Sequence, residues 1–115
     1  MKKQQGKLTF EELLAFIAEY DAFFRRRFPA ESKKNRILSR AVKLAEETGE
    51  LANAVLASLG DQRNRKLRKF RDYHLADEIA DVVITVLVVA QAFGIDVRDP
   101  LSKKMTKIKR RVAKW

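Results

Sequence analysis

An uncharged, strongly apolar stretch over residues 82–95 constrains the fold more than any other part of the chain, and residues 82–90 read VVITVLVVA. Valine and isoleucine favour strands. However, the stretch continues without Gly or Pro from LADEIAD, which has helical spacing and good helix formers. We therefore predict a helix that begins near residue 72 or 75, ends at Phe93 and is closed by Gly94. As a helix, the 14 uncharged residues span about 21 Å, which is too short to cross a bilayer.

A helix that is apolar on every side has to be buried on every side. A chain of 115 residues with three further helices can hardly cover it alone. We therefore predict that oligomerisation completes the core, in a homodimer or homotetramer with this helix at its centre.

Start signals mark the first and the last predicted helix. Thr9, with Glu12 three residues later, forms a capping-box pattern, and apolar residues at helical spacing continue to a stop before Pro29. Asp99 is expected to cap the last helix, with Pro100 in its first position. This last helix runs toward the end of the chain and is strongly basic.

The remaining helix is expected to begin near residue 32 or 36 and to end at Leu59, with Gly60 as a left-handed cap after it. Four helices without internal repeats or a low-complexity linker fit a single all-α domain over residues 1–115. In the first helix, Phe24 and Phe28 lie at the spacing expected for core residues.

The composition excludes several kinds of site. Without Cys, the chain has no disulfide or thiolate ligand, and with His74 as its single His, which we interpret as a surface residue, it cannot build a multi-histidine zinc site. The absence of Cys and of an apolar signal segment at residues 1–10 favours the cytoplasm. A net charge of +10 predicts non-specific adhesion to nucleic acid. The basic run at residues 62–71 could grip nucleic-acid phosphates, although a solvated connection or a helix start is the simpler interpretation.

Acidic residues are scarce, yet six of the fifteen lie in two short segments, KLAEETGEL and LADEIADV. On a helix, Glu47 and Glu50 share one face, as do Glu78 and Asp81. Two antiparallel helices could bring these pairs together, where each repulsive contact at ~4 Å costs on the order of 4 kcal/mol at an effective dielectric of ~20. Shared protons, a Lys or Arg partner, or a divalent cation would have to offset this repulsion. An all-carboxylate site suits Mg²⁺ or Mn²⁺.

An ordinary solvated face is the alternative interpretation of these acids, because Glu46, Glu47 and Glu50 lie opposite the apolar stripe of their helix. Asp81 argues against it, since the apolar stretch follows directly and should draw this residue into the core. Charged residues are rarely buried unless they are paired or bind a metal. A site made by both segments therefore explains the pattern better than a surface does.

The two acidic segments occur as EETGEL followed by DEIADV, with 27 residues between Glu50 and Glu78. This pattern resembles the EExxE…ExxD signature of MazG-like nucleotide pyrophosphohydrolases, in the all-α NTP pyrophosphatase superfamily. The apolar helix after the second motif, the turn at GIDV and the basic last helix are also similar to that family. The resemblance covers roughly residues 40–111 and implies a four-helix MazG-like bundle. It also offers an alternative for Phe24 and Phe28, because aromatics of the first helix can wall the family's base pocket.

The resemblance implies cleavage of a nucleoside triphosphate between its α and β phosphates, which yields a monophosphate and pyrophosphate. It implies Mg²⁺ or Mn²⁺ bound by Glu47, Glu50, Glu78 and Asp81, and Glu46 as the group that orients or deprotonates the attacking water. It also suggests a role in cleansing the nucleotide pool. Two alternatives stay open: a basic helical module that binds nucleic acid without catalysis, and a homologue that binds nucleotides without cleaving them.

Three cations are similar to residues with which the family contacts phosphates. Its last helix often reads Lys-x-x-x-Asn-x-x-Arg, which Lys104 and Arg111 match, whereas Ile108 stands at the Asn position and cannot donate a side-chain hydrogen bond. Lys104 and Arg111 could instead belong to a solvated basic helix. Lys43 is similar to a lysine one turn before EExxE, but it could equally pair with Glu47 at i,i+4.

Overall fold

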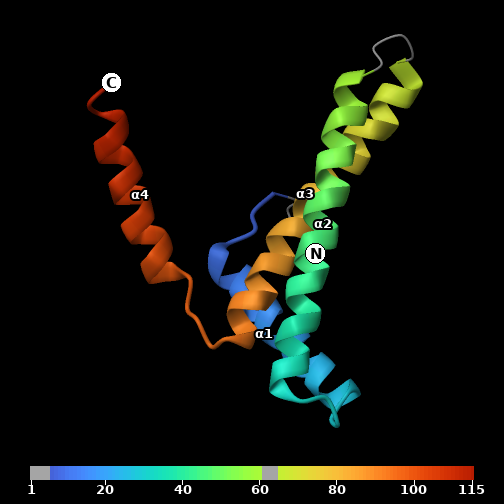
Figure 1. Cartoon of the computed structure of the whole chain (residues 1–115). Helices are drawn as coiled ribbons and strands as arrows, with labels where there is room; N and C mark the ends of the chain where they lie inside the picture. The colour runs from blue at the N-terminus through green and yellow to red at the C-terminus, as the bar shows by residue number, and fades with distance from the viewer. Residues whose placement is uncertain (1–5, 61–64) are drawn as a thin grey trace.

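The computed structural model describes residues 6–60 and 65–115, with side chains described for 6–60 and 74–115. This described part contains four helices and no strand, so the predicted all-α fold class is confirmed (Figure 1). The helices are α1 (Phe10–Arg27), α2 (Lys33–Gly60), α3 (Arg65–Ala92) and α4 (Arg98–Val112). Over the described residues, no helix is long and apolar enough to cross a membrane.

The ends of α1 agree with the sequence, whereas the end of α2 does not. Thr9 Oγ1 accepts a hydrogen bond from the backbone N–H of Glu12 at 3.1 Å, and α1 ends before the first proline, as predicted. Ser32 Oγ plays the same part at the start of α2 by accepting from the N–H of Asn35 at 3.1 Å. The predicted left-handed cap at Gly60 is wrong, because Gly60 is the last residue of α2 and has no positive φ. Glycine permits a left-handed backbone but does not impose one.

The valine-rich stretch is helical, as predicted, and forms the second half of α3. Gly94 has φ 69° and closes this helix, as predicted. Its N–H donates to the carbonyl of Gln91 at 3.0 Å, and the N–H of Ile95 donates to the carbonyl of Ala90 at 2.9 Å. This is the Schellman arrangement, in which a left-handed glycine gives the last carbonyls of a helix their donors.

The start of α3 at Arg65 is earlier than the predicted start near residue 72 or 75. The Arg, Lys and Leu residues of this segment are good helix formers, so the basic run can extend the helix. The side chains of this run lie outside the described residues, and its predicted role toward nucleic acid stays a prediction.

The start of α4 differs from the sequence-based expectation. The helix begins at Arg98, so the cap expected at Asp99 and the first position expected for Pro100 are wrong. Asp96 serves the helix start instead, because its Oδ1 accepts from the backbone N–H of Arg98 at 3.0 Å. With that donor satisfied, Asp99 becomes a first-turn residue, where a negative charge is favourable near the positive end of the helix dipole.

The first three helices form one packed unit. α2 and α3 run side by side in opposite directions, and α1 packs against α3 (Figure 1). The core joins Ile17 of α1 to Leu87 and Val88 of α3. Partly buried hydrophobic side chains surround these three: Leu13, Leu14, Tyr20, Ile84 and Val97. α4 projects away from this unit, and none of its residues is buried (Figure 1).

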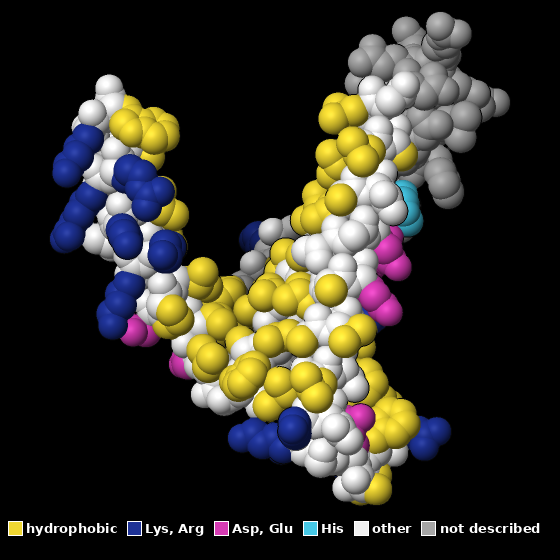
Figure 2. Space-filling view, in the orientation of Figure 1, with side chains coloured by type: hydrophobic (Ala, Val, Ile, Leu, Met, Phe, Trp, Pro, Cys, Tyr) yellow, Lys and Arg dark blue, Asp and Glu magenta, His cyan; other side chains and the backbone are white. Residues whose placement is uncertain are grey.

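The chain leaves much apolar surface uncovered. Its accessible surface is 9780 Å², whereas a compact monomer of this mass would expose about 6500 Å². Its radius of gyration is 17.7 Å, against about 13 Å for a compact chain of this length. Within the apolar stretch, Val83 and Val86 remain 42% and 46% exposed. Figure 2 shows hydrophobic side chains over the packed unit and along one side of α4, so a single chain does not bury α3 on every side.

Candidate functional site

Three glutamates from the two longest helices meet where α2 and α3 run side by side. Glu47 and Glu50 come from α2 and Glu78 from α3, and one carboxylate oxygen from each lies within 4.8 Å of those from the other two. Glu47 and Glu78 are each only 6% exposed, whereas Glu50 is exposed. The i,i+3 spacing on α2 and the antiparallel packing of α3 therefore bring together three of the four acids expected to share a site.

In each of the two buried glutamates, one carboxylate oxygen has a polar partner and the other has none among the described residues. Glu47 Oε1 lies 3.2 Å from Lys43 Nζ, and Glu78 Oε1 lies 3.4 Å from His74 Nε2. In both residues Oε2 is buried and has no hydrogen-bond partner among the residues that the structure describes. Burying an unpaired carboxylate oxygen is unfavourable unless a proton or a cation satisfies it. Three convergent carboxylates are a donor set that fits Mg²⁺ or Mn²⁺, which prefer oxygen ligands.

The electrostatics of the cluster favour added positive charge. Burial raises the pKa of Glu78, and the charges of Glu50 and Glu47 raise it further, while His74 acts in the opposite direction. Burial also raises the pKa of Asp81, with repulsion from neighbouring acids adding to it. The α2–α3 acids are therefore costly to keep ionised together, as expected for a cation site.

Asp81 and Glu46 lie around this cluster. Asp81 is half-buried one turn after Glu78 and, with Glu47, lines an adjoining pocket. Glu46 is on the exposed side of α2, and its Oε2 lies 3.6 Å from Lys43 Nζ. The i,i+4 pairing expected for Lys43 and Glu47 is present, and it raises the pKa of Lys43.

The adjoining pocket has a volume of about 360 Å³ and lies between α1, α2 and α3. Its aromatic walls are Tyr20 and Phe24, and its polar lining includes Arg40 and Lys43. Phe24 is partly buried and packs edge-on against Tyr20, with ring centroids 4.7 Å apart. Phe28, by contrast, is 53% exposed, so the expected core position is wrong for this residue. It is the C-cap residue of α1, directly after the last turn of the helix.

The sequence profile described as the MazG nucleotide pyrophosphohydrolase domain matches residues 36–114. The chain belongs to this family. Searches of curated proteins and of solved structures gave no match. MazG domains are nucleotide pyrophosphohydrolases that typically use a divalent metal, and the glutamate cluster lies inside the matched range.

The last helix of this MazG domain stands apart from the cluster. Lys104 and Arg111 are exposed on α4, which projects away from the packed unit, so the chain does not bring them to the glutamates (Figure 1). Ile108 belongs to an apolar stripe along α4, where each member is 45–57% exposed: Leu101, Met105, Ile108 and Val112. Within this MazG domain, Ile108 thus contributes to an apolar helix face.

Sequence reasoning missed two features of this chain. His74 is exposed, as expected, but it contacts Glu78 at the cluster, one turn earlier on α3. Asp21 is 3% exposed and bonds two arginines: its Oδ1 lies 3.2 Å from Arg40 Nη2 and its Oδ2 lies 3.2 Å from Arg25 Nε. A lone Asp four residues after Ile17, on the apolar face of the helix, was the available signal.

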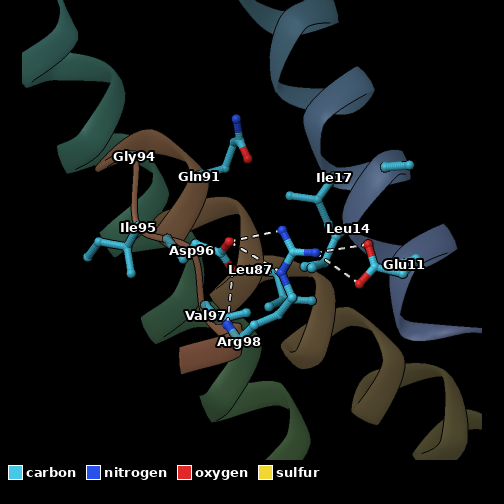
Figure 3. Close-up of a pocket in the computed structure, with 12 residues that line it drawn as sticks. Glu11, Leu14, Ile17, Leu87, Gln91, Gly94, Ile95, Asp96, Val97 and Arg98 are labelled. Carbon is cyan, nitrogen blue, oxygen red and sulfur yellow. Dashed lines mark hydrogen bonds and ion pairs between the residues drawn. The ribbon is translucent and has the colours of Figure 1, made fainter. Parts of the chain in front are cut away.

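A second pocket, of about 410 Å³, lies at the other end of the packed unit and holds an ion-pair network (Figure 3). Arg98 Nη1 donates to Glu11 Oε1 at 2.9 Å, and Arg98 Nη2 lies 2.9 Å from Asp96 Oδ2. Hydrogen bonds from Arg98 lower the pKa of Asp96. This network ties the turn before α4 to α1 and explains how the MazG domain anchors the base of its last helix.

Proposed function

We propose that the protein hydrolyses nucleoside triphosphates, ribo- or deoxyribo-, to the monophosphate and pyrophosphate, with Mg²⁺ as cofactor and Mn²⁺ as a substitute. The observation that carries this proposal is the α2–α3 glutamate cluster of a MazG domain, with two buried carboxylate oxygens that lack a donor. A cation at that position would satisfy both oxygens and offset the mutual repulsion.

We assign Glu47, Glu50, Glu78 and Asp81 to the metal. When bound, the cation would polarise a phosphoryl oxygen and the attacking water, as divalent ions do in phosphoryl chemistry. Glu46 lies beside the cluster on the exposed side of α2, where it can accept the proton of that water.

The phosphate-binding groups in this proposal are Lys43, Lys104 and Arg111. Lys43 lies beside Glu47, with its Nζ 3.2 Å from Oε1, and its exposed side chain is available to a phosphate bound near the cluster. Lys104 and Arg111 have no route to the cluster of their own chain, because α4 projects away.

We propose that the single domain over residues 1–115 works as a homodimer or homotetramer. The chain exposes about 3000 Å² more surface than a compact monomer would, and obligate interfaces commonly bury 2,000–5,000 Å² or more in total, so a stable interface of roughly that size fits. In such an assembly the apolar stripe of α4 can pack on a second copy of the chain. Lys104 and Arg111 can then approach the glutamates of that copy. We expect this activity in the cytoplasm, in cleansing the nucleotide pool.

A panel of nucleoside triphosphates tests the reaction. The protein is incubated with each nucleotide in Mg²⁺ or in EDTA, and monophosphate plus pyrophosphate is separated from diphosphate plus phosphate. Monophosphate and pyrophosphate in Mg²⁺ alone are expected. Diphosphate and phosphate as main products would contradict the mechanism. No turnover, with salt-sensitive binding to nucleic acid, would support the non-enzymatic alternative that the net charge of +10 favours.

A further inference from the structure

Among the described residues that line the α1–α2–α3 pocket, Arg40 is the cation that sits inside the fold. Its side chain is 12% exposed, whereas that of Lys43 at the same pocket is 59% exposed. Asp21 holds Nη2 of Arg40 at 3.2 Å, and the guanidinium carbon lies 5.1 Å from the centroid of the Phe24 ring. The guanidinium is therefore fixed at two points, and its Nε is buried without a hydrogen-bond partner in the described part of the chain.

The position of Arg40 relative to the glutamates sets which part of a nucleotide it can meet. Arg40 and Glu47 lie seven residues apart on α2, two helical turns on nearly the same face, or about 10.5 Å along the axis. Both line the pocket. With the reacting phosphate at the Glu47 end, the nucleoside extends toward Arg40, which then faces the base edge farthest from the sugar.

The lining of the pocket favours a base at this end over a phosphate. Phe24 lies against Arg40, and Tyr20, Ile84 and Val88 also line the pocket, which gives it hydrophobic and aromatic walls suited to a planar ring. The charge of Arg40 is already matched by buried Asp21. A highly charged phosphate group would have to be desolvated there, whereas the exposed Lys43 offers a phosphate a solvated partner.

We propose that Arg40 selects the base: it favours nucleotides with a carbonyl oxygen on that edge, at C6 of a purine or C4 of a pyrimidine, over those with an amino group there. This inference rests on the proposed function and names its substrate class. A guanidinium has only donors, so it bonds a carbonyl oxygen and opposes another N–H donor. Hypoxanthine, guanine, uracil and thymine carry the carbonyl, and adenine and cytosine carry the amino group.

Two matched pairs of substrates test the inference without any variant. ITP and ATP have purines of the same shape that differ at C6, and UTP and CTP differ in the same way at C4. We expect kcat/KM for the carbonyl member to exceed that for the amino member by about tenfold or more in at least one pair, as for a hydrogen bond to a charged group. Ratios within twofold in both pairs would overturn the inference.

Substitutions then identify the residue responsible. Arg40→Lys keeps the charge that Asp21 needs but loses the planar fork, and Arg40→Met loses both. In both variants KM for the carbonyl nucleotide should rise until kcat/KM is the same for the two nucleotides of a pair, and kcat should change less. Arg25→Met is the matched control, because Arg25 also bonds Asp21 but does not line the pocket, and it should leave the ratios unchanged. Equal losses for all four nucleotides in Arg40→Lys would show a structural or phosphate-binding role instead and overturn the inference.

Calorimetric binding of monophosphates separates this inference from the proposed function. Tighter binding of IMP than AMP, or of UMP than CMP, lost in Arg40→Lys, would support base selection even if no triphosphate were hydrolysed. If triphosphates were hydrolysed with no such preference, the proposed function would stand and base selection would fall. If no monophosphate bound and no triphosphate were hydrolysed, both would fall.

Discussion

Asp21 on α1 and the Glu47–Glu78 pair across α2 and α3 are all buried acids, but their surroundings differ sharply. Asp21 has an arginine on each carboxylate oxygen, Arg25 on one and Arg40 on the other. Among the described residues, Glu47 and Glu78 each have one polar neighbour, Lys43 and His74 respectively, one buried oxygen with no donor, and a third acid nearby. A buried acid whose oxygens are both paired adds to the stability of the fold, whereas convergent acids that repel one another and lack donors fit a divalent cation.

The largest effect should come from removing a proposed metal ligand. Glu78→Gln keeps the shape of the side chain but removes its charge, so turnover should fall on the order of a hundredfold or more. Steady-state hydrolysis, with circular dichroism to confirm folding, measures this loss. Asp77→Asn is the control, since Asp77 is exposed on the same helix and outside the cluster. If both variants retained wild-type activity, Glu78 would be no more than another structural acid.

Asp21→Asn should lower the free energy of unfolding, because Asp21 pairs with both Arg25 and Arg40. Removing one partner of a buried ion pair leaves the other charge uncompensated, which costs about 3–5 kcal/mol of unfolding free energy. Urea unfolding of this variant, beside Glu19→Gln at an exposed position of the same helix, measures the cost. A loss no greater than that of the surface control would remove the contrast between the two sites.

A divalent cation should raise the stability of the folded protein by binding at the glutamate cluster, and it should have no such effect through Asp21. A ligand that binds only the folded state adds about 2.7 kcal/mol at a hundredfold excess over Kd. Tm is compared in EDTA, in Mg²⁺ and in NaCl of equal ionic strength, because monovalent salt only screens charge. Glu47→Gln/Glu50→Gln should be more stable than wild type in EDTA and nearly indifferent to Mg²⁺. A wild-type response to Mg²⁺ no larger than to NaCl would mean that the glutamates are an ordinary acidic surface.

The smallest effect is expected from Asp96, an exposed acid that Arg98 pairs on the surface. Its folded-state pKa lies below the ordinary value of 3.8, so the pair contributes stability above pH 3.8 that is lost as pH falls through the folded-state pKa. Asp96→Asn should therefore lower Tm slightly near neutral pH, and the difference from wild type should vanish under more acid conditions. Thermal unfolding of both proteins across that range checks this, and a difference that grew toward low pH would reverse the assigned sign.

The sequence predicted helix ends correctly at three positions where the signal lies within one short segment. The Thr9 cap, the stop before Pro29 and the left-handed Gly94 all follow from local backbone chemistry, and all three are present. The errors also have local causes. At the start of α4 the helix begins at Arg98, earlier than the Asp-Pro signal indicates, and Asp96 accepts from the backbone N–H of Arg98. At Gly60 the permissive residue stayed helical.

Which acids come together is a different kind of question, because it depends on how helices distant in sequence are packed. The i,i+3 pattern alone places Glu47 and Glu50 on one face of α2. Only the antiparallel packing of α3 on α2 brings Glu78 within reach of them, and only the approach of α1 places Asp21 against Arg40. Helical periodicity and helix ends are set by neighbouring residues, so they can be read from the chain. The burial of Glu47 and Glu78, and the lack of a donor to one oxygen of each among the described residues, depend on how the helices pack, because packing removes water from some acids and leaves it around others.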